Sequence, residues 1–140
     1  MSADPFDLQR FVDAQAPVYA RVVEELRAGR KESHWMWFIF PQIAGLGQSP
    51  TSVRFALSSL DEARAYLAHP ILGPRLRECG ELVLGVEGRT AREIFGAVDQ
   101  MKLRSSMTLF ARASAEGNVF EQCLKRYFEG APDPATLARL

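Results

Sequence analysis

The chain has 140 residues, of which 47% are hydrophobic and 24% charged, and 17 Lys and Arg balance 17 Asp and Glu. This size and composition suit one globular domain, residues 1–140, around a single core. A net charge of zero argues against binding to duplex nucleic acid or to an anionic membrane. We find no signal peptide and no apolar run near the ~20 residues that span a bilayer, so we expect a cytoplasmic protein.

The two cysteines, Cys79 and Cys123, each lie in an apolar helical pattern with no second cysteine nearby. This pattern predicts two reduced, buried thiols. The sequence has no spacing typical of zinc ligands and no His-x-x-x-His pair. We therefore expect no metal site and no cofactor.

Helix signals recur along the whole chain. In chain order, the expected N-terminal signals are Asp4-Pro5, Pro17, Ser59 with Glu62, Pro74, Thr90 with Glu93, Asp99, Asn118 with Glu121, and Asp133-Pro134. Three of them match the capping-box pattern, and Asp99 is expected to cap a helix of its own. The second helix, which ends at Gly29, is expected to expose Glu24 and Glu25 to solvent. No hairpin signal occurs. The sequence predicts a mainly α, single compact helical domain of about seven helices, possibly with a minor two-stranded element.

The most apolar stretch of the chain contains both tryptophans and reads Ser33-His34-Trp35-Met36-Trp37-Phe38-Ile39-Phe40-Pro41-Gln42. We expect it in the core, because each exposed large apolar side chain would forfeit roughly 1.5–3 kcal/mol. Its length does not distinguish a buried helix from a buried strand. We favour a helix, because the chain offers no obvious strand to pair with it.

One helix has an unusual composition. Asp99, Lys102 and Ser106 have i, i+3 and i+7 spacing and share a face, with Ser105 beside them. They are candidates for the polar wall of a pocket, with Lys102 contacting a phosphate or carboxylate and the serines contacting sugar hydroxyls. The alternative, which spacing alone favours, is a solvated face with a surface pair worth a few tenths of a kcal/mol.

The aromatic run offers further candidates. His34 is a possible general acid or base, since histidine titrates near neutral pH, although a core histidine bonded to a backbone carbonyl is the favoured alternative. Trp35 and Trp37 are candidates for stacking on a base, although tryptophans in such an apolar run are more often core residues. Gln42 is the other polar group of the run.

The run, together with Gly45-Leu46-Gly47, His69-Pro-Ile-Leu-Gly-Pro-Arg-Leu76 and Ser105-Ser-Met-Thr-Leu-Phe110, resembles a bacterial family of unknown function whose members are often labelled "calpastatin-like". The resemblance covers nearly the whole chain, from Phe11 to Leu137. It implies a mainly helical fold.

A fainter resemblance is to the helical family that acts on ADP-ribose and related N-glycosides. Glu32-Ser33-His34-Trp35 is similar to its early Glu-His-aromatic segment, and Leu109-Phe110 with Leu124 and Gly130 to its late one. The chain departs from that pattern, since Ser33 separates Glu32 from His34 and no lysine precedes Phe110. By analogy with glycoside hydrolysis, Glu32 or Asp99 would stabilise oxocarbenium-like charge.

Two hypotheses follow. The first is a small-molecule binder or enzyme for a nucleotide or ADP-ribose-like ligand, with possible hydrolysis of an N-glycosidic bond. Its candidate catalytic groups are Glu32, His34 and Asp99, and its candidate ligand-binding groups are Trp35, Trp37, Gln42, Lys102, Ser105 and Ser106. The second is a non-catalytic interaction or regulatory domain, which predicts an exposed apolar patch and a partner. The oligomeric state is open at this point.

Overall fold

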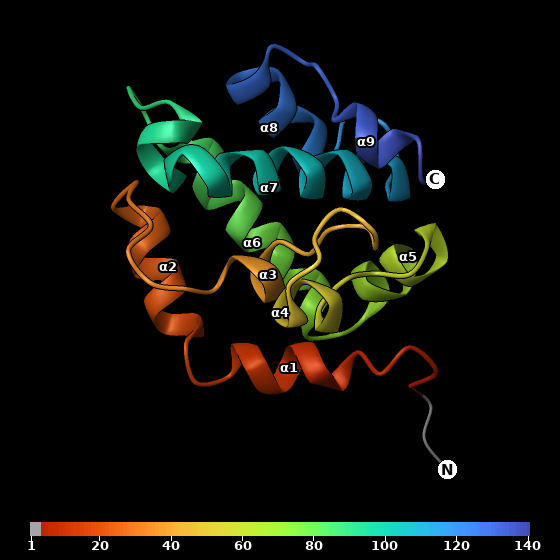
Figure 1. Ribbon diagram of the computed structural model, residues 1–140. Coiled ribbons are helices and arrows are strands. Elements are labelled where there is room, and N and C mark those ends of the chain that lie inside the picture. Colours follow the sequence, from red (N-terminus) through yellow and green to blue (C-terminus); the bar gives the residue numbers. More distant parts are fainter. Residues whose placement is uncertain (1–3) are drawn as a thin grey trace.

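The computed structural model describes residues 4–140, which fold into nine helices joined by short loops (Figure 1). The helices are α1 (Gln9–Gln15), α2 (Tyr19–Arg27), α3 (Met36–Ile39), α4 (Pro50–Arg54), α5 (Leu60–Ala68), α6 (Leu72–Gly85), α7 (Ala91–Ala113), α8 (Val119–Phe128) and α9 (Pro134–Leu137). The predicted mainly α class is confirmed, with nine helices in residues 4–140 where about seven were expected. None of these helices is long and apolar enough to cross a membrane.

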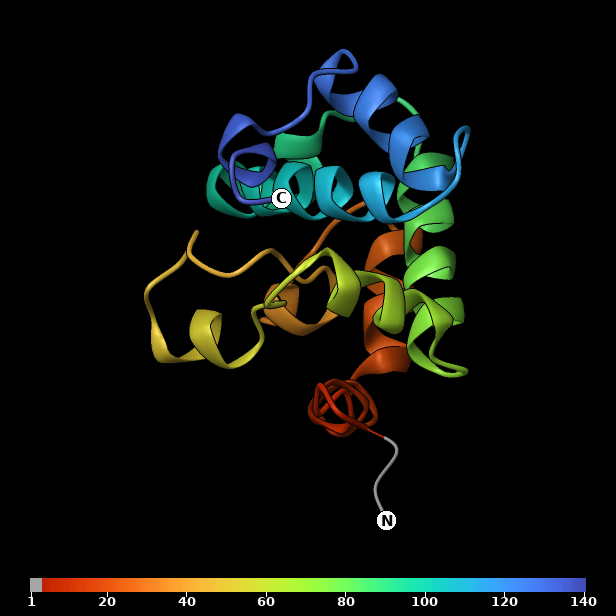
Figure 2. The ribbon, with the colours of Figure 1, turned by 90° about the vertical axis from the view of Figure 1, so that its right-hand side faces the viewer.

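The long helix α7 divides the molecule into two tiers. It contacts α8 and α9 on one side and α5 on the other, and α3 and α4 lie in the tier with α5 (Figures 1 and 2). Helix α6 contacts α2, α5 and α8, so it connects the two tiers. Helix α1 packs against α3 at the far edge of the lower tier.

A continuous row of aromatic side chains crosses both tiers. Phe11 of α1 meets Tyr66 of α5 with ring centroids 5.2 Å apart. Tyr66 meets Phe110 of α7 at 5.4 Å, and Phe110 meets Phe120 of α8 at 5.7 Å. All four side chains are almost fully buried. One hydrophobic core therefore joins helices from both ends of the chain.

The aromatic run forms a single helical turn, α3, as predicted. The chain then leaves α3 and meets the segment after α4 in one parallel bridge between Ile43 and Leu57. The Leu57 N–H donates to the Gln42 carbonyl at 2.9 Å, and the Ala44 N–H donates to the Leu57 carbonyl at 2.8 Å. Within residues 4–140 this bridge takes the place of the minor two-stranded element considered from the sequence.

The capping signals are partly confirmed. Thr90 and Glu93 form a reciprocal capping box, with the Glu93 N–H donating to Thr90 Oγ1 at 3.1 Å and the Thr90 N–H to Glu93 Oε1 at 2.9 Å. Ser59 and Asn118 also cap their helices with their side chains. Their partner glutamates, however, bind other N–H groups, so these two boxes are one-sided.

The expectation that Asp99 caps a helix is wrong. Helix α7 begins at Ala91, well before Asp99, and the non-helical backbone of Gly96 divides it into two limbs at a kink. Gly96 has φ 88° and ψ 168°, a conformation that residues with a Cβ rarely adopt. Asp99 lies on the longer limb after the kink, where its carboxylate is free to make contacts outside its own helix.

Candidate functional site

Two lysine ammonium groups flank the Asp99 carboxylate. Lys31 Nζ lies 2.9 Å from Asp99 Oδ2, and Lys102 Nζ lies 3.0 Å from Asp99 Oδ1. The Lys31 side chain is 7% exposed and the Lys102 side chain 22% exposed. Lys31 is therefore the inner cation of this group and Lys102 the outer one.

Each ammonium also lies over a tryptophan ring. Lys31 Nζ is 5.0 Å from the centroid of buried Trp35, and Lys102 Nζ is 4.8 Å from the centroid of half-buried Trp37. These separations are within the range of favourable cation–π contacts. We call Lys31, Trp35, Trp37, Asp99 and Lys102 the tryptophan–lysine cluster.

The charge of the tryptophan–lysine cluster is positive. Burial alone would raise the pKa of Asp99, but hydrogen bonds and charge attraction from Lys31 and Lys102 hold that pKa below its ordinary value. Asp99 is therefore ionised at neutral pH. One carboxylate facing two ammonium groups leaves one positive charge, which favours an anionic ligand.

Backbone contacts position the inner lysine. The Lys31 N–H donates to the Ile94 carbonyl at 2.8 Å, which ties the loop after α2 to the first limb of α7. The Lys31 ammonium also donates to the Ser33 carbonyl at 2.7 Å. Gly96, where α7 kinks, lies between Ile94 and Asp99 in the chain. Lys31 therefore contacts both limbs of α7, the first through the Ile94 carbonyl and the second through the Asp99 carboxylate.

Glu25 is a polar residue near the cluster whose position we predicted wrongly from the sequence. We expected it on the solvent face of α2, but it is 6% exposed. Its carboxylate accepts hydrogen bonds from the Glu32 N–H at 2.7 Å, the Ser33 N–H at 3.0 Å, the Ser33 hydroxyl at 2.5 Å and Trp35 Nε1 at 3.0 Å. The spacing in the sequence does indicate that Glu25 is buried. It directly precedes Leu26 and follows Val22 by three positions, so it shares the buried face of α2.

Burial opposes ionisation of Glu25, but these hydrogen bonds outweigh it. Together they lower the pKa of Glu25 to about 2. The carboxylate fixes the backbone of the loop and the indole of Trp35. Glu25 therefore acts as a positioning group for the aromatic run.

Two of the remaining candidates, Glu32 and His34, lie at the surface. Glu32 is exposed, and its nearest cationic partner is Arg30, at 4.0 Å. His34 is exposed as well, so the interpretation of His34 as a core histidine is wrong. Gln42 is half-buried, and its carbonyl takes part in the bridge to Leu57.

The two serines differ from each other. The Ser105 hydroxyl donates to the Met101 carbonyl at 3.1 Å and to Asp133 Oδ2 at 2.9 Å, so it is already engaged with the C-terminal segment. The Ser106 hydroxyl is fully buried and is the one buried side-chain polar group in residues 4–140 without a hydrogen-bond partner. Of the polar stripe expected on this helix, Asp99 and Lys102 are the two residues that belong to the tryptophan–lysine cluster.

Comparison with known proteins identifies the family of this chain. Residues 5–140 match the family described as "Protein of unknown function (DUF1810)". The chain belongs to the DUF1810 family. The crystal structure of a conserved hypothetical protein from Mycobacterium tuberculosis is 61% identical, with a TM-score of 0.96 over 98% of each chain. No curated protein matches at a significant level.

These findings correct the finer resemblances drawn from the sequence. The likeness to a family of unknown function is confirmed. The "calpastatin-like" label and the likeness to the ADP-ribose family receive no support from the family match or from the related structure. Neither match assigns an activity to the DUF1810 protein, so function has to be argued from its side chains.

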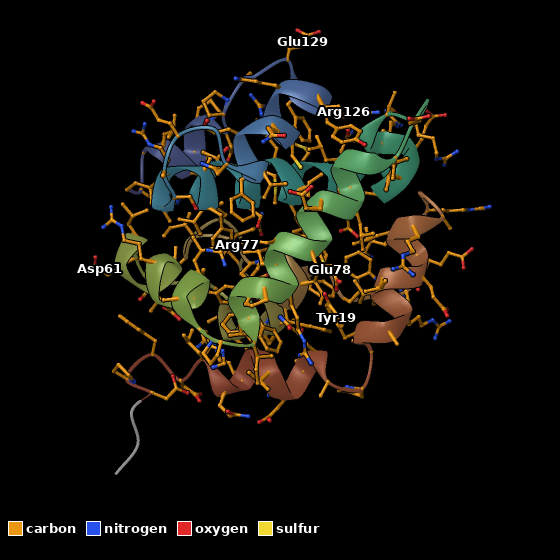
Figure 3. The ribbon with its side chains drawn as sticks, turned by 180° about the vertical axis from the view of Figure 1, so that it is seen from behind. Tyr19, Asp61, Arg77, Glu78, Arg126 and Glu129 are labelled. Carbon is orange, nitrogen blue, oxygen red and sulfur yellow. The ribbon has the colours of Figure 1, made fainter. Side chains whose placement is uncertain are left out.

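A second polar group of the DUF1810 protein lies between α2 and α6. The Tyr19 hydroxyl of α2 donates to Glu78 of α6, and the two side chains point toward each other (Figure 3). Burial and this hydrogen bond raise the pKa of Tyr19. Arg75 lies over the Tyr19 ring, 4.7 Å from its centroid. These contacts hold α2 against α6, and they engage the Tyr19 hydroxyl in a structural hydrogen bond.

The two cysteines are buried thiols, and the described residues contain no cluster of metal ligands. Cys79 and Cys123 are free and buried, as predicted. Burial raises the pKa of each thiol to about 12. Residues 4–140 contain no group of three or more His, Cys, Asp or Glu side chains placed to hold a metal ion.

Proposed function

We propose that this DUF1810 protein binds a small anionic molecule with a planar ring, such as a nucleotide, at the tryptophan–lysine cluster. One observation carries the proposal. The partly exposed Lys102 ammonium lies over the half-buried Trp37 ring and is held there by Asp99. A cation beside an aromatic face offers one contact for an anion and one for a ring.

The electrostatics support an anion rather than a cation as ligand. A lysine ammonium is a compact point charge on a flexible four-carbon chain, which suits contact with a phosphate or carboxylate. Lys102 is the more exposed of the two lysines, so it makes that contact. Lys31 lies behind Asp99 and contributes charge without touching the ligand.

The ring contact falls to Trp37. Trp35 is buried and its indole N–H is bonded to Glu25, whereas Trp37 keeps part of its surface open. Stacking of a base on an aromatic side chain is worth about 1–3 kcal/mol in single-stranded nucleic-acid complexes. This magnitude is enough to separate a nucleotide from an anion that lacks a ring.

Binding is better supported than hydrolysis of an N-glycosidic bond. A general acid must be protonated near neutral pH, whereas its two lysine partners keep Asp99 ionised. Those same ammonium groups already neutralise the charge that an oxocarbenium-like sugar would need. Glu32 is 64% exposed, so water surrounds its carboxylate. We therefore propose binding without catalysis at this cluster.

Intrinsic fluorescence tests the proposal, because Trp35 and Trp37 are the only tryptophans in the chain. The protein is titrated with ADP-ribose, AMP, tripolyphosphate and adenosine. We expect the compounds with both ring and anion to bind more tightly than either part alone. Lys102→Ala should weaken their binding by about tenfold or more, since a charge-assisted contact is worth about 1.5–3 kcal/mol. The matched control is Arg27→Ala, which removes an exposed cation on α2 and should change nothing.

Two results would overturn this function. One is the absence of any fluorescence change with all four compounds at millimolar concentration. The other is binding that Lys102→Ala leaves as strong as in the unmodified protein.

One observation favours an interaction domain as a second candidate function. Val98 and Met101 on α7 are 69% and 66% exposed, and their i, i+3 spacing places them side by side. Large apolar side chains at neighbouring surface positions are typical of protein contacts. Light scattering of the unmodified protein and of Met101→Asp tests this candidate. A larger assembly that dissociates in the variant would support it, and a monomer in both would exclude self-association through this surface.

A further inference from the structure

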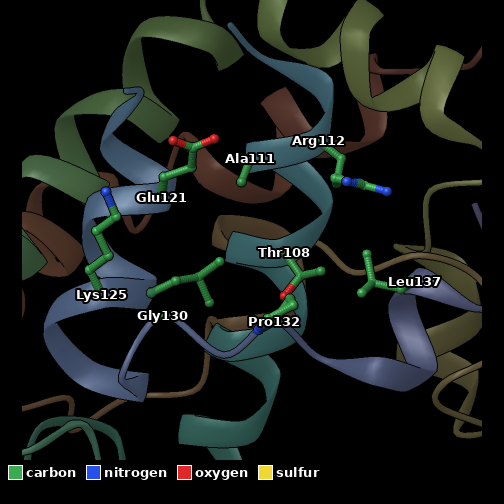
Figure 4. A pocket seen from close by; sticks show the side chains of 9 residues that line it. Thr108, Ala111, Arg112, Glu121, Lys125, Gly130, Pro132 and Leu137 are labelled. Carbon is green, nitrogen blue, oxygen red and sulfur yellow. The ribbon is translucent and has the colours of Figure 1, made fainter. Parts of the chain in front are cut away.

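A cavity of about 270 Å³ lies between α7, α8 and the segment that leads into α9 (Figure 4). Its apolar lining includes Ala111 of α7, Leu124 of α8 and Leu137 of α9. Cavities that hold small molecules usually measure about 300–1,000 Å³, and a cavity of about 150 Å³ is large enough for benzene. This cavity therefore fits a ring or short alkyl chain with one polar group.

Hydrogen bonds build one wall of the cavity. The Asp133 N–H donates to Thr108 Oγ1 at 2.8 Å, and the Thr108 hydroxyl donates to the Arg104 carbonyl at 2.8 Å. The Arg104 guanidinium donates to the carbonyls of Ala131 and Pro132 at 3.0 and 2.9 Å. These bonds fix the segment after α8 against α7, so the cavity exists before any ligand arrives.

Two cations without partners stand at its rim. Arg112 and Lys125 are both exposed, and neither takes part in an ion pair or hydrogen bond within residues 4–140. The rim has one carboxylate, Glu121, which accepts a hydrogen bond from the Gly117 N–H at 2.9 Å. Figure 4 shows the Arg112 guanidinium directed toward α9 and the Glu121 carboxylate on the opposite side, on α8. The lining of this cavity therefore carries two cations and one carboxylate.

Arg112 also stands where this cavity continues into a second one. Both cavities are lined by Ala111, Arg112, Glu121 and Leu137. The second cavity adds the apolar Leu60 and Leu140 and the polar Ser114 and Glu116. An apolar chain that starts in the first cavity can therefore extend into the second.

We propose that this cavity is a binding site for a small apolar carboxylate. Its apolar body packs on Ala111, Leu124 and Leu137, and its carboxylate pairs with Arg112, whose planar fork suits bidentate recognition. Lys125 adds a second positive charge at the opposite rim. The site involves no member of the tryptophan–lysine cluster. This proposal is therefore independent of the function proposed above.

The test uses 3-phenylpropionate and octanoate as probes, each with its neutral amide as the matched compound. Binding is followed by amide chemical shifts in the ¹H–¹⁵N spectrum of the full chain. We expect both acids to shift the signals of Thr108, Ala111 and Leu137, and the amides to bind at least about tenfold more weakly.

Three variants separate the contributions. Arg112→Gln keeps the length of the side chain but removes its charge, so it should weaken acid binding about tenfold and leave amide binding unchanged. Ala111→Met places a larger side chain in the cavity and should weaken the binding of both the acids and the amides. Arg92→Gln, an exposed cation at the other end of α7, and Lys102→Ala should change neither.

Each of three results would overturn the proposal. The first is the absence of shifts around the cavity at millimolar acid. The second is equal affinity for acids and amides in the unmodified protein. The third is acid binding that survives Arg112→Gln while circular dichroism shows the fold intact.

Discussion

The Nε1 group of Trp35 donates a hydrogen bond to Oε1 of Glu25 at 3.0 Å, and this bond joins the aromatic run to α2. The same carboxylate holds the two residues that precede His34, through the Glu32 and Ser33 N–H groups. The Lys31 ammonium lies over the ring of Trp35. The position of the tryptophan–lysine cluster therefore depends on one buried carboxylate.

Replacing Glu25 should destabilise the protein. Glu25→Ala leaves the Trp35 indole N–H and the Ser33 N–H without an acceptor, and each buried donor left unpaired costs about 1–3 kcal/mol. We expect a loss of about 3 kcal/mol in the free energy of unfolding, measured by urea denaturation. The control is Glu24→Ala, which alters an exposed neighbour and should stay within about 0.5 kcal/mol. Equal effects of the two variants would contradict the role of Glu25.

Stability should also fall in acid because of Glu25. Its pKa is about 2 in the folded protein against an ordinary value of 4.5. A lowered pKa stabilises the fold above pH 4.5, and this contribution is lost as the pH falls through 4.5 toward 2. With 1.36 kcal/mol per pKa unit, the full contribution is about 3 kcal/mol. Urea denaturation over this pH range should show a shallower decline for Glu25→Gln. A decline as steep as that of the unmodified protein would contradict the prediction.

The Lys31–Asp99 pair predicts strong coupling in a double-mutant cycle. Asp99→Ala leaves the Lys31 ammonium, 7% exposed, without its partner, and breaking a buried pair from one side costs about 3–5 kcal/mol. The double variant Lys31→Met, Asp99→Leu should recover most of that loss, because the buried Lys31 ammonium is then removed together with its partner carboxylate. Denaturant unfolding measures both. Additive losses in the double variant would show that the two groups do not depend on each other.

Gly73 and Gly85, both on α6, form a matched pair. A Cβ at Gly73 would lie 2.1 Å from the Leu67 carbonyl oxygen, whereas a Cβ at Gly85 would meet nothing within 4 Å. We expect Gly73→Ala to cost about 3 kcal/mol or more through overpacking, and Gly85→Ala to be neutral or stabilising by up to about 1 kcal/mol. Thermal unfolding distinguishes them. A tolerated alanine at position 73 would mean that α5 and α6 do not approach as closely as described.

The two cysteines should resist thiol reagents in the native protein. Burial raises the pKa of Cys79 and Cys123 to about 12, so almost no thiolate exists at pH 8. Both thiols should react with a disulfide reagent after denaturation, and neither should react rapidly before it. Rapid labelling of one thiol in the native state would show that its helix opens locally.

Much of the fold was predictable because its signals are local. Thr90 with Glu93 and Asp133 with Pro134 begin helices as their side-chain chemistry requires. The kink at Gly96 also follows from a residue type. By contrast, the local sequence around Asp99 predicts a helix cap, whereas in the structure its carboxylate pairs with Lys31 and Lys102.

The candidate site was predictable only in part. The spacing of Asp99 and Lys102 places them on one face, and the structure adds Trp37 to that face. Lys31 was missed as a site residue because its contacts come from distant parts of the chain. The bond of Ser105 to Asp133 had no local signal, since it depends on the fold of the C-terminal segment.

The two indole N–H signals in the ¹H–¹⁵N spectrum give the most direct test of the proposed function. The spectrum of Trp37→Phe assigns them, since one signal disappears. If the tryptophan–lysine cluster binds a ring-bearing anion, ADP-ribose or AMP should shift the Trp37 indole signal more than the Trp35 signal, and Lys102→Ala should abolish the shift. An unmoved Trp37 signal at saturating nucleotide would contradict the account and turn attention to a protein partner at Val98 and Met101.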